Sequence, residues 1–200
     1  MEHTKLDRTS HYAGLLARRL GLDVDSMRFA TPMRDVGMTR VSTSTLLKPG
    51  RLTAPERREM QRHAGIGRDM LTGSDNPLQE LAATIAWTHH ERLDGSGYPR
   101  GLAGDDIPIE GQVAGIADMF GALVSNRSYR APWPVDDALR IILQERGEHF
   151  ATRLVDTFFE LMAEIVGERL CDVALAGYSS SPRRMPSATA AARSETPSFS

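Results

Sequence analysis

The chain has 200 residues, with 24 basic and 26 acidic side chains, a formal net charge of −2 and one cysteine. This length fits a single domain with a sizeable core. Because the net charge is near zero, the chain has no overall electrostatic potential that would attract polymeric nucleic acid or an anionic membrane. The lone Cys171 excludes a disulfide framework and a cysteine-built zinc site, and it is typical of a reducing compartment.

The N-terminal segment MEHTKLDRTS carries charges where a signal peptide needs an apolar stretch. No apolar run along the chain approaches the length of a membrane span. We therefore expect a cytoplasmic protein without membrane contact.

The first half of the chain predicts three helices. Leu6, Tyr12, Leu15, Leu16 and Leu20 recur at helical spacing before Gly21. A second helix is expected from Ser26 to Val36, where it would bury Met27, Ala30 and Met33 and be kinked at Pro32. Residues 41–53 read as irregular, and the capping box of Thr53 with Glu56 starts a third helix that carries Met60, His63, Ile66 and Leu71.

The second half predicts more helices. Asn76 before Pro77 opens one that brings His89 and His90 to its C-terminal end. The glycine-rich residues 93–106 form a loop, after which Pro108 starts a helix that contains Asp118. Two further helices are expected at 135–144 and 153–166, and no strand alternation is present.

The resulting fold prediction is an all-α bundle of about six to seven helices over residues 1–176. Residues 177–200, rich in serine, proline and alanine, are expected to form a disordered tail because they offer little apolar surface to offset their ordering entropy.

Side chains that can bind metal fall on four of these predicted helices. They are Asp35, His63, His89, His90 and Asp118. Helical bundles hold metal ions in this way, and imidazole with carboxylate suits iron, manganese, nickel or zinc. Each residue also has an ordinary interpretation: a lone histidine is usually a partly exposed or capping side chain, the aspartates could form ion pairs, and paired histidines favour a helix C-terminus.

The segment HHERLDGSGYPRGL strengthens the metal interpretation, because it resembles the signature of the HD-GYP family, a branch of the HD phosphohydrolase superfamily. The matching residues are His89, His90, Glu91, Asp94, Gly95, Gly97, Tyr98, Pro99, Gly101 and Leu102. Similarity extends to LLKPGRLTAPERREMQRHAGIG, GIADMFGALVSNRSYR and GEHFATRLV, so it covers residues from about 5 to about 165.

This resemblance implies an HD-domain helical bundle that hydrolyses cyclic di-GMP with two or three metal ions. Asp35 would bridge two ions, His63, His89 and His90 would bind one of them, and Asp118 would bind the other. Two-metal sites share a hydroxide and stabilise the leaving oxygen in an in-line displacement.

The resemblance also implies substrate contacts. Arg127 and Arg130 would hold phosphate through their guanidinium forks. Gly95 and Gly97 would supply turn conformations closed to other residues, so that Tyr98 and Pro99 form a fixed surface beside the pocket. Docking to a diguanylate cyclase domain and formation of a homodimer are further implications.

The chain departs from the family pattern at the site of the first ion. Arg34 replaces the histidine of the HD pair, Met38 replaces a lysine, and Lys5 stands where the first-helix histidine is expected. Arginine and lysine offer no free lone pair that could bind a metal ion. In a poorly screened pocket, the repulsion between their positive charge and a metal ion would cost several kcal/mol. We therefore expect one metal site rather than two, with Arg34 paired to Asp35 or Asp118.

Three hypotheses follow. The chain is a phosphodiesterase that works with one ion and with Arg34 as a fixed cation, or it is a receptor in which Arg34, Arg127 and Arg130 hold the nucleotide without turnover. In the third hypothesis it is an interaction protein whose GYP loop docks a cyclase.

Overall fold

The computed structural model describes residues 5–126 and 131–167, and these residues form an all-α fold. Its α-helices are α1 (Lys5–Leu20), α2 (Val24–Ala30), α3 (Thr43–Leu46), α4 (Ala54–Gln61), α5 (His63–Leu71), α6 (Pro77–Thr88), α7 (Ile109–Leu123), α8 (Val135–Gln144) and α9 (Thr152–Val166). Two 3-10 helices, η1 (Thr31–Arg40) and η2 (Gly104–Asp106), complete the set. In place of strands, the described residues contain two isolated bridges, Asp94 with Ala103 and Arg146 with Phe150.

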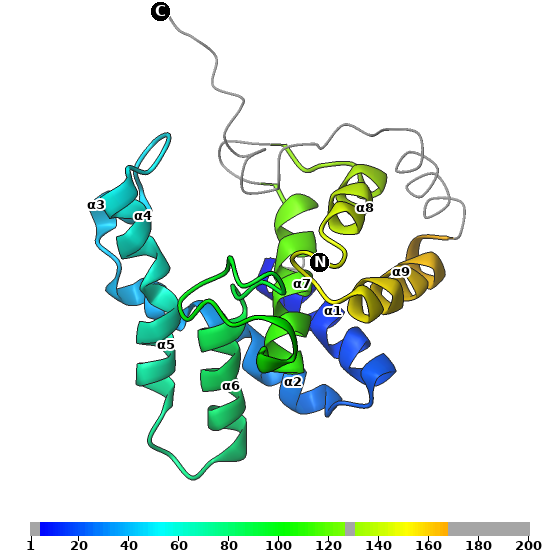
Figure 1. Ribbon diagram of the computed structural model, residues 1–200, viewed down its shortest axis with the longest axis horizontal. Helices are drawn as coiled ribbons and strands as arrows, with labels where there is room; N and C mark the ends of the chain where they lie inside the picture. Colours follow the sequence, from blue (N-terminus) through cyan, green and yellow to red (C-terminus); the bar gives the residue numbers. More distant parts are fainter. Residues whose placement is uncertain (1–4, 127–130, 168–200) are drawn as a thin grey trace, which may run out of the picture.

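Helix α7 is the central helix of the bundle, with α1, α6 and α8 around it (Figure 1). It is apolar on most of its surface, and Val113, Ile116 and Phe120 are fully or almost fully buried. The Phe120 ring meets Tyr12 of α1 and Phe158 of α9 edge to face, with centroid distances of 5.0 and 5.2 Å. The core therefore ties the first and last described helices to the helix that contains Asp118.

Helices α5 and α6 lie side by side as an antiparallel pair beside α7 (Figure 1). The predicted start of α6 is confirmed: the Asn76 side chain accepts a hydrogen bond from the Leu78 amide at 3.0 Å, and Pro77 occupies the first turn. The helix ends at Thr88 and is capped by His89. Its end packs closely against α7, because a Cβ on Gly115 would lie 2.8 Å from the carbonyl oxygen of His89.

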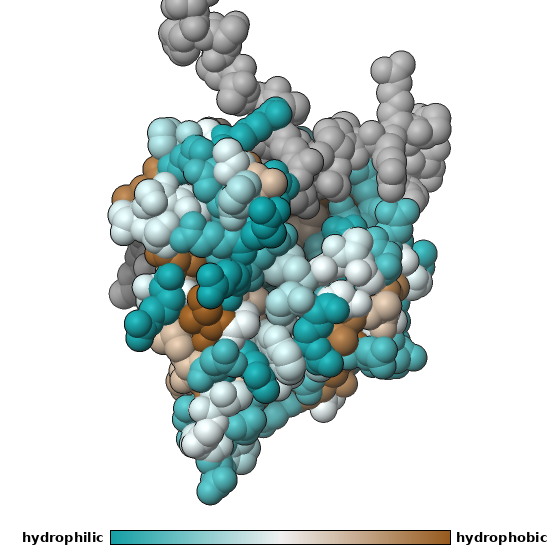
Figure 2. All heavy atoms as spheres, turned by 60° about the vertical axis from the view of Figure 1, so that its left-hand side comes forward, coloured by the Kyte–Doolittle hydropathy of each residue, from teal (hydrophilic) through white to brown (hydrophobic). Residues whose placement is uncertain are grey.

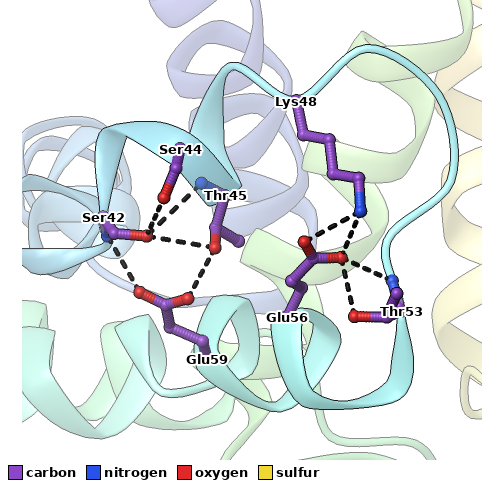
Figure 3. A network of polar contacts seen from close by, with 7 residues as sticks. All are labelled: Ser42, Ser44, Thr45, Lys48, Thr53, Glu56 and Glu59. Carbon is purple, nitrogen blue, oxygen red and sulfur yellow. Dashed lines mark hydrogen bonds and ion pairs between the residues drawn. The ribbon is translucent and has the colours of Figure 1, made fainter.

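Helices α3 and α4 project from one side of the bundle and are joined mainly by polar contacts (Figure 3). Glu59 accepts hydrogen bonds from the Ser42 amide and the Thr45 hydroxyl at 3.1 and 2.5 Å. Glu56 binds the Lys48 ammonium at 2.6 Å and closes the predicted capping box with Thr53. The face that carries these helices is largely hydrophilic, with small separate apolar areas (Figure 2).

Three details of the predicted helices were wrong. The second helix ends at Ala30 and gives way to the 3-10 helix η1, which contains Pro32 and leaves Met33 39% exposed. Residues 41–53 include the short helix α3. The third predicted helix is divided between α4 and α5 at Arg62. These divisions explain why the fold has more helices than the predicted six to seven, although its all-α class is confirmed.

No helix among the described residues is both long and apolar enough to span a bilayer. The predicted tail at 177–200 lies outside the described residues.

Candidate metal centre

Four of the five predicted metal ligands converge on one point. Asp35, His63, His89 and His90 each offer a ligand atom, and these atoms all lie within 4.8 Å of one another. The residues come from η1, the start of α5 and the end of α6, so three separate elements meet here. The geometry on which the metal prediction depended is present.

Backbone carbonyls orient two of the imidazoles. His63 Nδ1 lies 2.7 Å from the Met60 carbonyl oxygen, and His89 Nδ1 lies 3.0 Å from that of Ile85. A carbonyl oxygen can only accept a hydrogen bond, so Nδ1 carries the proton in both rings and Nε2 of the neutral ring has a free lone pair. Metal-binding histidines are commonly oriented in this way.

The free lone pairs face the Asp35 carboxylate. Asp35 Oδ1 lies 3.6 Å from His63 Nε2 and 3.8 Å from His89 Nε2. Both Nε2 atoms are buried and have no hydrogen-bond partner among the described residues. A buried lone pair without a donor is costly, and a divalent cation among these three atoms would satisfy all of them. The residues present therefore fit a metal ion.

Burial keeps two of the histidines neutral. It lowers the pKa of His89 despite the opposing effect of Asp35. It also holds the pKa of His90 well below the ordinary histidine value, with a further contribution from the neighbouring His89 and His63 rings. Neutral imidazole is the form that binds metal, so these shifts favour ligation.

The fifth predicted ligand, Asp118, is paired with an arginine. Arg34 Nη2 lies 2.6 Å from Asp118 Oδ1 and 3.3 Å from Asp35 Oδ2. Arg34 is only 2% exposed and also donates a hydrogen bond from Nη1 to the Thr31 carbonyl oxygen at 3.3 Å. The expected pairing of Arg34 with these aspartates is confirmed, and a guanidinium lies between Asp118 and the histidine cluster.

The GYP loop, residues 93–106, covers one side of the cluster. The Tyr98 ring stacks on His90 with a centroid distance of 4.6 Å, and it lies edge to face with His63 at 6.3 Å. Burial, followed by the charges of Asp35 and Asp118, raises the pKa of Tyr98 above its ordinary value. The phenol therefore remains protonated as a hydrogen-bond donor beside the cluster.

The two loop glycines have different roles. Gly95 has φ +75°, so it adopts the left-handed conformation predicted for it. Gly97 does not have a positive φ, and this part of the prediction was wrong. A Cβ on Gly97 would lie 2.4 Å from the Arg92 amide nitrogen and 2.5 Å from Glu91 Cα, so this position requires glycine for space.

Contacts of Glu91, Arg92 and Trp87 within and beside the GYP loop were not predicted. Glu91, 4% exposed, accepts hydrogen bonds from the Arg100 and Leu102 amides at 2.8 and 2.9 Å. Arg92 pairs with Glu145 at 2.9 Å. Trp87 contacts the guanidinium groups of Arg68 and Arg100, at 4.2 and 4.4 Å from the ring centroid. Glu91 is one of the residues that match the HD-GYP segment, but the sequence did not indicate its role in holding the loop.

The structure gives no side-chain contacts for some of the predicted site residues. Arg127 and Arg130 are outside the described residues. Lys5 begins α1, and its side chain is also outside the description. Pro99 is exposed on the GYP loop, next to Tyr98.

Comparison with known proteins gives consistent results. A protein-family profile described as "HD domain" matches residues 2–154. The cyclic di-GMP phosphodiesterase response regulator RpfG of Xanthomonas campestris is 44% identical over 169 residues, which cover 83% of this chain and 44% of that protein. The 3′3′-cGAMP-specific phosphodiesterase 2 of Vibrio cholerae is 40% identical over 167 residues, which cover 82% of this chain and 32% of that protein.

The solved structures agree on the fold. The crystal structure of a cyclic GMP-AMP specific phosphodiesterase from V. cholerae superposes with a TM-score of 0.58 at 16% identity, covering 84% of this chain and 48% of that one. The chain spans less than half the length of the two curated relatives named above. With its bundle, its histidine cluster and its GYP loop, the chain belongs to the HD domain family and, within it, to the HD-GYP type.

Proposed function

We propose that this chain hydrolyses a phosphodiester bond of a cyclic dinucleotide with one divalent metal ion. The main support is the convergence of Asp35, His63, His89 and His90 on one point. Two buried Nε2 atoms, which have no hydrogen-bond partner among the described residues, face the Asp35 carboxylate there. The relatives named for cyclic di-GMP and 3′3′-cGAMP support the substrate class. Iron, manganese, nickel and zinc all suit the donor set.

Each residue has a defined task in this proposal. Asp35, His63, His89 and His90 hold the ion, which when bound supplies Lewis acidity toward the phosphoryl oxygens. Tyr98, stacked on His90 and kept protonated, donates a hydrogen bond to the substrate at the mouth of the site. Pro99 and Gly97 shape the loop beside it, and Arg127 and Arg130 remain predicted phosphate ligands.

A receptor is the second candidate, and one observation favours it. Asp118, the predicted ligand of the other ion, forms an ion pair with Arg34 at 2.6 Å. A site that loses one of two ions loses several kcal/mol of transition-state stabilisation, so binding can outlast turnover. Contacts with a diguanylate cyclase domain or with a second copy of this chain remain predictions.

The test is hydrolysis by the purified, metal-loaded chain. Cyclic di-GMP and 3′3′-cGAMP are incubated separately with protein loaded with Mn²⁺ or, without oxygen, with Fe²⁺, and the products are separated by chromatography. We expect a linear dinucleotide or mononucleotides from the parent chain and none from Asp35→Asn. Asp69→Asn, a change at an exposed aspartate of α5, is the matched control and retains activity.

Calorimetry on the same samples separates the two candidates. Product formation that is lost in Asp35→Asn supports the enzyme. Nucleotide binding without product from a fully metal-loaded chain contradicts the enzyme and favours the receptor.

A further inference from the structure

One carboxylate, Asp35, is shared between two groups at the centre of the site. Its Oδ1 faces His63 Nε2 and His89 Nε2 at 3.6 and 3.8 Å, whereas its Oδ2 lies 3.3 Å from Arg34 Nη2. The same guanidinium nitrogen lies 2.6 Å from Asp118 Oδ1. A carboxylate that divides its oxygens in this way can link two cations, and Arg34 already is one of them.

The formal charges favour one exchangeable ion. With neutral imidazoles, the two carboxylates of Asp35 and Asp118 and the single guanidinium of Arg34 leave one negative charge. A divalent ion would change this to one positive charge, which matches the single negative charge of a phosphodiester. A second divalent ion would have to enter beside a guanidinium that cannot lose its proton.

Arg34 is also fixed in position. It is 2% exposed, and its Nη1 binds the Thr31 carbonyl oxygen within η1. The 3-10 helix η1 is pressed against α5, because a Cβ on Gly37 would lie 2.1 Å from the His63 carbonyl oxygen. The guanidinium is therefore held by the Thr31 carbonyl oxygen and by the carboxylates of Asp35 and Asp118, on a segment packed closely against α5.

We propose that the guanidinium of Arg34 is a permanent second cation of this site, which shares Asp35 with a single exchangeable metal ion. Arg34 is thus a positioning residue: it neutralises Asp118, holds Asp35 with Oδ1 toward the histidines, and excludes a second ion. The role of Arg34 in hydrolysis rests on the proposed function, whereas the number of metal ions that the chain binds can be tested without it.

The first experiment counts ions. Purified chain is saturated with Mn²⁺, freed of excess by gel filtration, and its metal and protein contents are measured. The parent chain binds one ion, and Arg34→His, which replaces the cation with a ligand between two carboxylates, binds two. Arg28→His on the exposed part of α2 is the matched control and binds one.

Two outcomes overturn the proposal. One is a parent chain that binds two ions with Arg34 in place, a result that needs no variant to fold. The other is a folded Arg34→His chain, checked by circular dichroism, that still binds one ion.

The second experiment separates kcat from KM. Because Arg34 is almost fully buried, its loss changes the field at the site and leaves substrate contacts unchanged. Arg34→Met is expected to lower kcat by about tenfold or more, with KM within about twofold, and Arg34→Lys restores part of kcat. An increase in KM with unchanged kcat contradicts this role. If the parent chain shows no hydrolysis, the proposed function fails, and the ion count alone decides the role of Arg34.

Discussion

Arg34 Nη2 and Asp118 Oδ1 lie 2.6 Å apart although the two residues are separated by 84 positions in the sequence. This ion pair joins η1 to the central helix α7. Arg34 is 2% exposed and the Asp118 side chain is 21% exposed, so the pair is shielded from solvent mainly on the arginine side. We expect this ion pair to stabilise the fold and to control how many metal ions the site can bind.

Removing the acidic partner should destabilise the fold. In Asp118→Asn the buried guanidinium keeps Asp35 as its one charged partner among the described residues, and we expect a loss of about 1 to 3 kcal/mol in the free energy of unfolding. Chemical denaturation of the metal-free protein measures this loss. Asp156→Asn, which breaks the exposed pair with Arg146, is the control and should change stability by less than about 0.5 kcal/mol. Equal effects of the two substitutions would argue against a shielded pair.

Adding a methyl group at Gly97 should disturb the GYP loop. The new Cβ would lie 2.4 Å from the Arg92 amide nitrogen, against backbone that cannot rotate away. We expect Gly97→Ala to destabilise the protein by about 1 to 3 kcal/mol and to weaken substrate binding. In Gly65→Ala the Cβ would meet nothing within 4 Å inside α5, so that variant should gain about 0.5 to 1 kcal/mol. A neutral result at Gly97 would show that the loop can shift.

Removing one imidazole should weaken metal binding strongly. His63→Ala deletes a ligand whose Nδ1 is already held by Met60 and whose Nε2 faces Asp35. Competition against a fluorescent chelator should show a loss of Mn²⁺ affinity of about a hundredfold or more. The exposed His11 of α1 provides the control, because His11→Ala should leave the affinity unchanged. Similar losses in both variants would place the ion elsewhere.

The capping box of α4 predicts a pH effect on stability. The hydrogen bond from Lys48, followed by those from Thr53, lowers the pKa of Glu56 from 4.5 to about 2. A carboxyl whose folded-state pKa is depressed stabilises the fold above its unfolded pKa, and that contribution is lost as the pH falls from about 4.5 toward 2. Glu56→Gln should therefore lower the melting temperature at pH 7 and have a smaller effect near pH 3. An equal difference at both pH values would contradict this assignment.

Short-range patterns in the sequence predicted most helices, and the resemblance to the HD-GYP family predicted the ligand cluster. Apolar spacing located α1, α7, α8 and α9, and the Asn76 cap located the start of α6. The GYP segment matched its family residue by residue, and it identified His89, His90 and the loop that packs on them.

Other features depended on tertiary contacts that the sequence does not display. The 3-10 form of η1 accompanies the close approach of Gly37 to α5, which no local propensity indicates. The space required at Gly97 arises from the backbone of Glu91 and Arg92 folding over it. The loop-anchoring role of Glu91 became apparent only once its two amide donors were located.

The most direct test of the metal centre is an anomalous-difference map from crystals of the chain grown with Mn²⁺. The account predicts one strong peak within coordination distance of Asp35 Oδ1 and of the His63, His89 and His90 imidazoles, with Arg34 still bound to Asp118. Crystals that show manganese at other positions and none among these four residues would contradict it.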